Sequence, residues 1–214
     1  EVVAFPKDVE DIKSIVRYVI ENKPANPTLS ITARSQGTDM SGAAINDSIV
    51  MDTNRYLNKI WDVTNESAWT QPGVKYRDFE AETLKQGVYM PSYPASRELA
   101  GMGGIVNNNS GGERSLTFGK TAQYVTELKM VLADGNEYVI KPLNKQELVQ
   151  KMSQGDYEGN LYKQIFDLIE ANYDMVKAAK PHVSKDSTGY HIWDVWDRET
   201  GIFDLTKLFV GAQG

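Results

Sequence analysis

The sequence predicts an α+β fold, and three observations lead to this prediction. Helix-like and strand-like segments alternate between residues 8 and 61 in the order helix, strand, loop, strand, which suits a small α/β unit. Further on, Asp134-Gly135 separates two strand-like runs and is the strongest hairpin signal in the chain. Two loops rich in glycine and polar residues, 34–42 and 101–119, interrupt the regular elements. Together they predict one polar ligand that is held from two sides.

The first part of the chain is predicted to form a short apolar start, a helix and two strands. An apolar start at residues 3–5 ends at a proline. Asp8 is placed to cap a helix that extends to about residue 22, because apolar residues recur at helical spacing and acidic residues occupy the first turn. Residues 29–33 alternate as in a strand, and residues 48–52 form a second short apolar run.

The rest of the chain is predicted to alternate between short strands and helices. Strands are expected at 68–74, 123–133 and 137–141, with an edge strand at 56–61, and helices at 76–85, 98–106, 145–152 and 157–179. Proline and glycine bound several of these segments, as expected where helices and strands end. The aromatic residues Tyr190, Trp193 and Trp196 are expected in the core.

The composition is that of an ordinary soluble globular protein. The chain has 214 residues, 41% of them hydrophobic, which allows one large domain or two small ones with a real core. A net charge of −6 gives no reason to expect nucleic acid or an anionic membrane as a partner. The lack of cysteine excludes disulfides, thiolate metal sites and cysteine nucleophiles, and is compatible with the cytoplasm. With only two histidines, no metal site is expected.

The first loop has the composition of an anion-binding turn. A strand delivers it to a point where the chain must turn, and successive backbone N–H groups in such a turn can form a concave anion site. Arg34 either reaches a phosphate or braces the loop. For this loop alone, a glycine turn without a ligand is the simpler interpretation. The candidate binding residues are Arg34, Ser35, Gln36, Gly37, Thr38 and Asp39.

The second loop is harder to explain without a ligand. Two glycine pairs, 103–104 and 111–112, bracket three consecutive asparagines. Glycine lets another group approach the backbone, and asparagine supplies both a donor and an acceptor. A tight, solvent-filled loop held by asparagine–backbone bonds is the alternative. The candidate binding residues here are Gly103, Gly104, Asn107, Asn109 and Ser110.

Two familiar phosphate-binding motifs do not match. Gly119-Lys120-Thr121 resembles the end of a P-loop, but Arg114 stands where that motif needs a glycine. The fingerprint of nicotinamide-dinucleotide folds is G-x-G-x-x-G between a strand and a helix, and neither loop supplies it. A conventional nicotinamide-binding fold is therefore disfavoured.

Several short motifs nevertheless occur in a fixed order along the chain. Residues 34–42 read R-S-Q-G-T-D-M-S-G, and residues 103–112 read G-G-I-V-N-N-N-S-G-G. The others are Pro72-Gly73-Val74, the P-x-x-P segment at 91–94, Phe118-Gly119, and the closing segment 203–214. The ordered set resembles the FAD-binding domain of the vanillyl-alcohol oxidase and p-cresol methylhydroxylase type, closest to its glycolate oxidase and D-lactate dehydrogenase branch. Pro94 and Gly119 join the candidate cofactor-binding residues through this resemblance.

The resemblance implies two α+β subdomains, at about residues 1–65 and 66–214, with FAD between them. The loop at 34–39 would hold the FAD pyrophosphate, although Ser35 stands where the family usually has glycine. Neither loop carries a histidine or cysteine placed to anchor the flavin, so non-covalent binding is expected. The family pattern continues past residue 214, so we expect a chain truncated at its C-terminus, without the substrate domain and inactive alone. No catalytic residue is assigned.

The reaction implied by the resemblance is oxidation of an alcohol or a 2-hydroxy acid such as lactate or glycolate, with hydride transfer to flavin N5. Two alternatives stay open. One is the flavin domain of a nucleotide-sugar reductase, and the other is a non-catalytic nucleotide-binding module that has lost flavin. The intact enzyme is expected in the cytoplasm or at the periphery of the inner membrane, with no nucleic acid partner.

Overall fold

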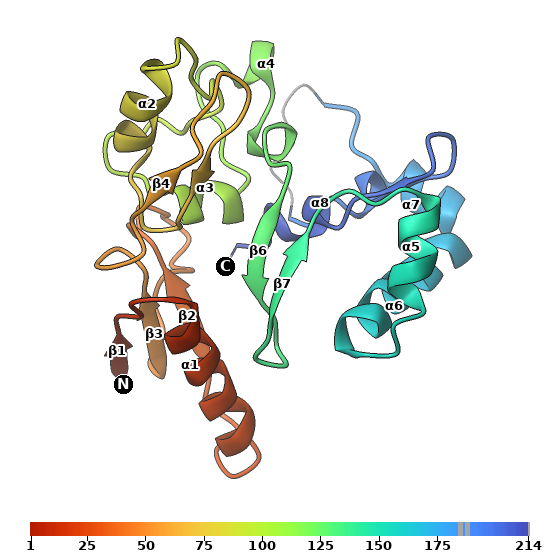
Figure 1. Ribbon diagram of the computed structural model, residues 1–214, viewed down its shortest axis with the longest axis horizontal. Coiled ribbons are helices and arrows are strands. Elements are labelled where there is room, and N and C mark those ends of the chain that lie inside the picture. The colour runs from red at the N-terminus through yellow and green to blue at the C-terminus, as the bar shows by residue number, and fades with distance from the viewer. Residues whose placement is uncertain (184–185, 187–188, 214) are drawn as a thin grey trace.

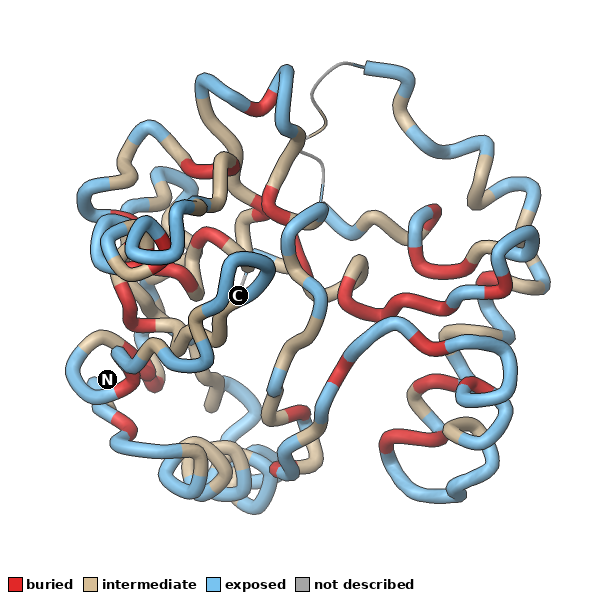
Figure 2. The backbone as a smooth tube through the Cα atoms, turned by 45° about the horizontal axis from the view of Figure 1, so that its top comes forward, coloured by how far each residue is buried: buried red, intermediate tan, exposed pale blue. Residues whose placement is uncertain are grey.

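The computed structural model describes residues 1–183, 186 and 189–213. Figure 1 shows the N-terminal helix and sheet on one side, the helices of the C-terminal third on the other, and a β-hairpin between them. Figure 2 shows buried residues on both sides of this hairpin. They include two hydrophobic clusters, one containing Tyr76 and Ile105 and the other containing Tyr162 and Phe203. The described residues therefore pack into two hydrophobic cores.

The N-terminal unit is a three-stranded parallel sheet. Its strands, in spatial order, are β1 (Val2–Ala4), β3 (Ile49–Asp52) and β2 (Ile31–Arg34). The central strand β3 is buried along most of its length, as its unbroken apolar run predicts. Arg34 pairs with Asp52 at the ends of β2 and β3. The segments that follow these two strands therefore leave the sheet at the same edge.

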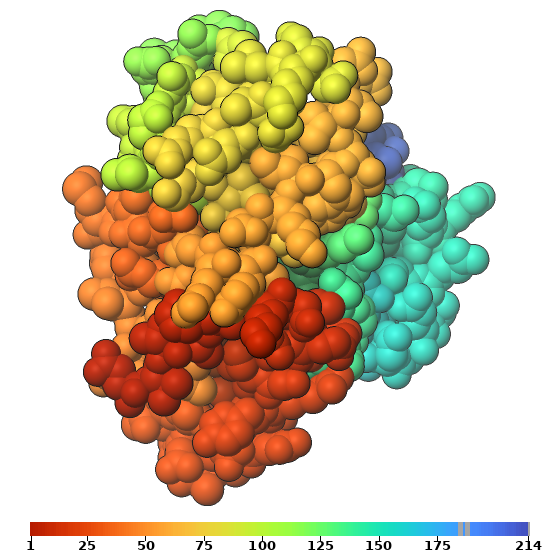
Figure 3. Space-filling model, turned by 60° about the vertical axis from the view of Figure 1, so that its left-hand side comes forward, coloured from red at the N-terminus to blue at the C-terminus, as the bar shows by residue number. Residues whose placement is uncertain are grey.

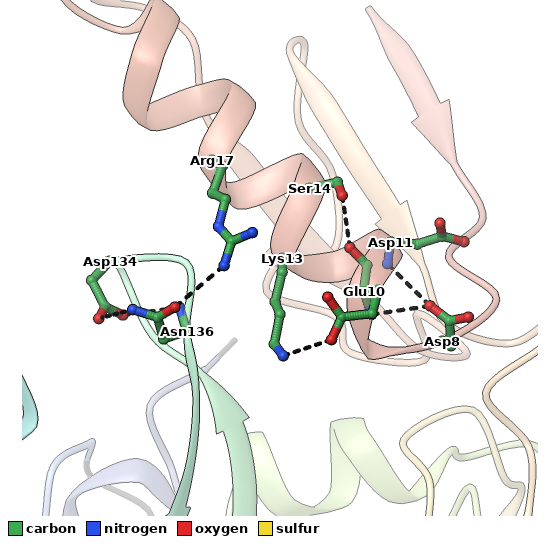
Figure 4. A network of polar contacts seen from close by, with 8 residues as sticks. All are labelled: Asp8, Glu10, Asp11, Lys13, Ser14, Arg17, Asp134 and Asn136. Carbon is green, nitrogen blue, oxygen red and sulfur yellow. Dashed lines mark hydrogen bonds and ion pairs between the residues drawn. The ribbon is translucent and has the colours of Figure 1, made fainter.

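Helix α1 (Val9–Asn22) connects β1 to β2 and begins where the sequence predicts. The carboxylate of Asp8 accepts the N–H groups of Glu10 at 3.0 Å and Asp11 at 3.1 Å, which satisfies two donors of the first turn. Figure 4 shows this cap and the ion pair that Lys13 makes with Glu10 one turn further on. The cap fixes the start of the helix, so the chain returns to the sheet in a defined place.

The predicted hairpin is confirmed, and its tip contacts α1. Strands β6 (Leu128–Val131) and β7 (Glu137–Ile140) pair antiparallel around the Asp-Gly turn. Arg17 of α1 donates from Nη2 to Oδ1 of Asn136 at 3.3 Å (Figure 4). Gly135 has φ +77°, and a Cβ there would lie 2.7 Å from the Arg17 side chain. The tip of the hairpin thus lies against α1 of the N-terminal unit.

In the sequence, a short two-stranded ribbon and several short helices come between the parallel sheet and the hairpin. They are β4 (Ile60–Trp61), β5 (Trp69–Thr70), α2 (Tyr76–Leu84), α3 (Met102–Asn107), α4 (Ser115–Phe118) and the 3-10 helix η1 (Thr121–Gln123). The turn between the paired strands β4 and β5 contains the predicted subdomain boundary at 65/66, which stays a prediction. In the space-filling view of Figure 3, this region adjoins the N-terminal unit.

Two predicted elements in this region start later than expected. The helix expected at 98–106 begins at Met102, because Met102 N–H donates to Val74 and Tyr76 N–H donates to Ala100. These bonds hold residues 100–102 in an extended pairing that a helix could not make. The strand expected at 123–133 begins only at Leu128, and Gln123, its expected first residue, is the last residue of η1.

The C-terminal third is built from helices and short strands. They are α5 (Lys145–Met152), α6 (Tyr157–Ala171), α7 (Tyr173–Ala178), the 3-10 helix η2 (Ile192–Asp194), β8 (Trp196–Asp197), β9 (Ile202–Phe203) and α8 (Thr206–Phe209). Helix α5 has the predicted bounds. The single helix predicted at 157–179 is wrong: it breaks at Asn172, which leaves the helical conformation while its side-chain amide donates to the Leu168 carbonyl.

Of the three aromatic residues predicted to lie in the core, two are buried and one is exposed. Trp193 and Trp196 are buried in the core as expected. Tyr190 is 60% exposed, so its predicted place in the core is wrong. Residue 214, the last of the closing motif, lies outside the described residues.

Candidate functional site

The carboxyl edge of the parallel sheet carries the first predicted loop. Residues 35–44 follow β2 directly, and residues 53–54 follow β3 at the same edge. In open sheets of parallel strands, ligands bind beyond the carboxyl ends of the strands. The topology therefore presents this loop where a ligand can reach it.

Arg34 braces the loop. Its Nη1 donates to the carbonyl of Ala44 at 3.0 Å, so the side chain joins the two ends of the loop. Gly37 has φ +62° and lies against the guanidinium, which a Cβ at that position would strike. Both the positive φ and the lack of space require glycine there. Of the two roles considered for Arg34, the structure shows the bracing contact.

The same loop leaves several backbone donors without a partner. Within the residues that the structure describes, no acceptor receives the N–H groups of Gln36, Gly37 and Thr38. Backbone N–H groups in folded proteins are nearly always paired, with protein, water or a ligand. Consecutive unpaired N–H groups in a turn form the type of concave site that binds anions. This loop is therefore suited to a phosphate-bearing ligand.

The glycines at the start of α3 serve different purposes. A Cβ on Gly101 would strike the Ser35 hydroxyl, and a Cβ on Gly103 would lie 2.6 Å from the Pro72 side chain. These two glycines allow α3 to pack against the first loop and the turn before α2. Gly104 differs, because the nearest atom to its Cβ position is Ser35 Cβ at 4.0 Å. The space beside Gly104 is open.

That space is a pocket of about 280 Å³ between the two predicted loops. Its lining includes most of the predicted cofactor-binding residues: 34–39, Pro94, Gly103, Gly104, Asn107 and Ser110. Segments that are about 65 residues apart in the sequence thus face one cavity. Pockets for drug-sized ligands have roughly 300–1,000 Å³, so this one is large enough for part of a dinucleotide.

Two predicted residues do not line this pocket. Asn109 has φ +42° and is buried, and its Oδ1 accepts the N–H of Ala122 at 2.9 Å. Its Nδ2 is buried without a hydrogen-bond partner among the described residues. Gly119 ends α4 at φ +75°, and a Cβ there would strike the Gln123 side chain. Their role in cofactor binding stays a prediction.

The pocket also contains residues that the sequence did not reveal. Pro72 lies in the wall, and its carbonyl accepts the Ser35 hydroxyl at 2.8 Å. Gln213 also lies there, at φ +67°, because its N–H donates to the Asn107 carbonyl at 2.8 Å. The proline had a signal, since it belongs to the P-G-V motif. Gln213 belongs to the closing segment 203–214, but that motif did not place it in the pocket, because its position depends on residues 211–213 lying against α3.

One acidic group lies in the pocket wall. A hydrogen bond from the Ser41 hydroxyl, together with backbone N–H groups of the loop, lowers the pKa of Asp39 below its ordinary value. Asp39 is therefore ionised at neutral pH. Its negative charge lies in the wall that also carries the unpaired N–H groups, and it opposes the binding of an anion.

Two other kinds of site are not seen in the part of the chain that the structure describes. It contains no group of three or more His, Asp or Glu side chains that could hold a metal ion. No helix there is both long and apolar enough to cross a membrane.

Comparison with known sequences identifies a family. Residues 1–141 match the FAD binding domain. A D-2-hydroxyglutarate dehydrogenase of Pantoea ananatis is 28% identical over 217 residues, covering all of this chain and 21% of that protein. A D-lactate dehydrogenase of Archaeoglobus fulgidus is 30% identical over 63% of this chain and 29% of its own length. The glycolate oxidase subunit GlcD of Bacillus subtilis is 30% identical over 64% of this chain and 28% of its own length.

Comparison with solved structures agrees on the fold. The 6-hydroxy-D-nicotine oxidase of Arthrobacter nicotinovorans superposes with a TM-score of 0.56 and 26% identity, over 65% of this chain and 29% of that one. The grass-pollen glucose dehydrogenase Phl p 4, at 21% identity and a TM-score of 0.55, shares the fold over 70% of this chain. The predicted α+β fold of the p-cresol methylhydroxylase type is confirmed.

The residues present fit the dinucleotide that this family binds. The first loop offers unpaired N–H groups to a diphosphate, and the open space beside Gly104 leaves room for the ligand to lie against α3. The chain spans only about a fifth of the length of the Pantoea D-2-hydroxyglutarate dehydrogenase, 21% of it. The match over residues 1–141, the shared fold and the two-loop pocket lead to one conclusion: this chain belongs to the FAD binding domain family.

Proposed function

We propose that this chain is the FAD-binding part of a dehydrogenase or oxidase of 2-hydroxy acids. The observation that carries the proposal is the chemistry named for its relatives. Proteins from Pantoea, Archaeoglobus and Bacillus are named for D-2-hydroxyglutarate, D-lactate and glycolate, and all three compounds are 2-hydroxy acids. When bound, FAD supplies the electron acceptor for such a reaction, because its flavin N5 takes a hydride from the alcohol carbon.

The chain's own residues would bind and orient the cofactor. In this proposal the N–H groups of Gln36, Gly37 and Thr38 hold the diphosphate, and Arg34 keeps the loop in shape from behind. Residues of α3 and the segment after it, including Asn107 and Ser110, form the opposite wall. Support for this placement comes from the unpaired donors and from the open space at Gly104. Binding is proposed to be non-covalent, since neither loop carries a histidine or cysteine.

The full-length enzyme provides the test. Purified protein should carry flavin, and its visible absorbance should bleach without oxygen when D-2-hydroxyglutarate, D-lactate or glycolate is added. Comparing the three rates identifies the substrate. Bleaching by a reduced nicotinamide but by none of the 2-hydroxy acids would replace this proposal with the nucleotide-sugar reductase. A protein without flavin that also fails to bind added FAD would favour a module that has lost the cofactor.

The location of the intact enzyme is part of the proposal. A cytoplasmic enzyme, either free or peripheral to the inner membrane, is consistent with a sequence that has no cysteine. Fractionation of cells that express the full-length protein tests this placement.

A further inference from the structure

Asn54 lies directly behind the first pocket loop. It follows β3 by two residues, at the carboxyl edge of the sheet, and it is half-buried. Its backbone N–H donates to the carboxylate of Asp52 at 2.8 Å, which fixes the turn that begins where β3 ends. The position of Asn54 relative to the sheet is therefore defined.

Both polar atoms of the Asn54 side chain contact the loop. Its Nδ2 donates to the Ser35 carbonyl at 2.7 Å, and its Oδ1 accepts Nε2 of Gln36 at 2.8 Å. These two loop residues directly precede or begin the run of unpaired N–H groups. Both side-chain hydrogen bonds of Asn54 are thus made to the loop. The amide therefore acts on the loop alone.

Hydrogen bonds of the neighbouring residue Thr53 also fix the backbone at the end of β2. The N–H and hydroxyl groups of Thr53 both donate to the Arg34 carbonyl, at 2.9 and 3.2 Å. The end of β2 is thus held by Thr53, and the next two residues of the loop are held by Asn54. A loop that is already held in the conformation that a ligand needs loses less conformational entropy when the ligand binds.

We propose that Asn54 is a positioning residue for the cofactor: its side-chain amide holds Ser35 and Gln36 so that the free N–H groups at 36–38 are ready for the FAD diphosphate. The inference rests on the proposed placement of FAD, and it adds a residue outside the pocket wall to the binding machinery. Asn54 is not among the residues that line the pocket. Its effect on FAD therefore passes through the loop.

The test measures binding of FAD and of FMN, which lacks the second phosphate and the adenosine, to the full-length enzyme after removal of its flavin. Asn54→Ala should weaken FAD binding about tenfold or more, because two hydrogen bonds that order the loop are lost. FMN binding should change by no more than about twofold, so the preference for FAD over FMN falls. Asn54→Asp keeps the acceptor for Gln36 but cannot donate to Ser35, and its preference should fall as well.

Asn58→Ala is the matched control. Asn58 is the same residue type four positions later, is exposed, and makes no side-chain hydrogen bond in the described structure. It should leave both affinities unchanged. A wild-type ratio of FAD to FMN affinity in Asn54→Ala and Asn54→Asp, whether or not both affinities fall together, overturns the proposal. If Gly104→Val also retains full FAD affinity, the placement of FAD is wrong as well; if Gly104→Val loses FAD, only the role of Asn54 is wrong.

Discussion

At the scale of single residues, adjacent glycines in α3 have opposite reasons to be glycine. Gly103 is enclosed by Pro72, so a side chain there would disturb packing. Gly104 faces open space in the pocket, so a side chain there would disturb only a ligand. The sequence shows a pair of glycines and cannot separate the two cases. The structure separates them by what a single added carbon would meet.

Substitutions at the two glycines should therefore have different effects. Gly104→Ala should leave the free energy of unfolding of the flavin-free protein unchanged or raise it by up to about 1 kcal/mol, because alanine favours helix over glycine. Gly104→Val should abolish retention of FAD with little loss of helix. Gly103→Ala, the control, should destabilise the flavin-free protein. Chemical unfolding and flavin content measure both effects, and a Gly104→Val protein with normal flavin would place the cofactor elsewhere.

The charge of Asp39 gives a second prediction at this scale. Asp39→Asn keeps the shape and the acceptor for Ser41 but removes a negative charge from the pocket wall. FAD should bind more tightly by about 1 kcal/mol, which is the size of an interaction between exposed charges. Salt should reduce the gain, since it screens such charges. Titration with FAD at low and high salt measures it.

Asp47→Asn is the control for this charge, because Asp47 is exposed and precedes β3 at the opposite end of the sheet. It should change FAD affinity very little. An equal gain in both variants would show that overall charge, rather than the position of Asp39, determines the effect.

At the scale of elements, those that depend on local sequence signals were predicted correctly, and those that depend on contacts with distant residues were not. Helix α1 was predictable because Asp8 is a strong cap before a regular apolar pattern. The Asp-Gly hairpin was predictable for a similar reason. The late start of α3 was not, because it depends on a pairing with Val74 and Tyr76 far back in the chain. The break at Asn172 lay inside an unbroken apolar pattern and gave no warning.

The same division applies to the site. The two loops were recognisable in the sequence, because glycine, asparagine and hydroxyl residues rarely occur together in such number. Their meeting in one pocket was an inference from the order of motifs. Asn54 and Gln213 were not predictable, since an ordinary turn residue and a residue at the chain end acquire roles only through distant contacts.

The hairpin supplies a prediction on pH. The Tyr138 hydroxyl donates to Oδ2 of Asp134 at 2.6 Å, and this bond to a carboxylate is the main cause that raises the pKa of Tyr138 to about 12. An ordinary tyrosine ionises near pH 10, so the bond stabilises the hairpin fully below about pH 10 and is lost as pH rises towards about 12. An ultraviolet titration should show one tyrosine ionising near pH 12 that is missing in Tyr138→Phe. If the ionisation that is missing in Tyr138→Phe lies near pH 10 instead, the bond is absent in solution.

At the scale of the whole molecule, one ligand should stabilise distant parts of the chain together. The pocket is shared by the loop after β2 and by the segment around α3, whereas α5 lies in the other core. A ligand that binds the folded state stabilises it by about 2.7 kcal/mol at a hundred times its Kd. The predicted subdomain boundary at 65/66 separates the two loops, so this coupling would act across it.

Hydrogen exchange of the full-length protein tests this coupling. Adding FAD should slow exchange in residues 35–44 and 101–110 to a similar degree, while α5, which does not touch the pocket, should change little. Slower exchange in only one of the two loops would mean that they do not share the ligand.

The placement of Gln213 in the pocket bears on how the cofactor is acquired during biosynthesis. The loop after β2 leaves the ribosome early, but the wall formed by Gln213 and held to Asn107 is translated last among the described residues. A nascent polypeptide cannot complete the cavity before that residue has emerged. Flavin therefore finds its complete binding site only after residue 213 has left the ribosome, whatever the length of the polypeptide.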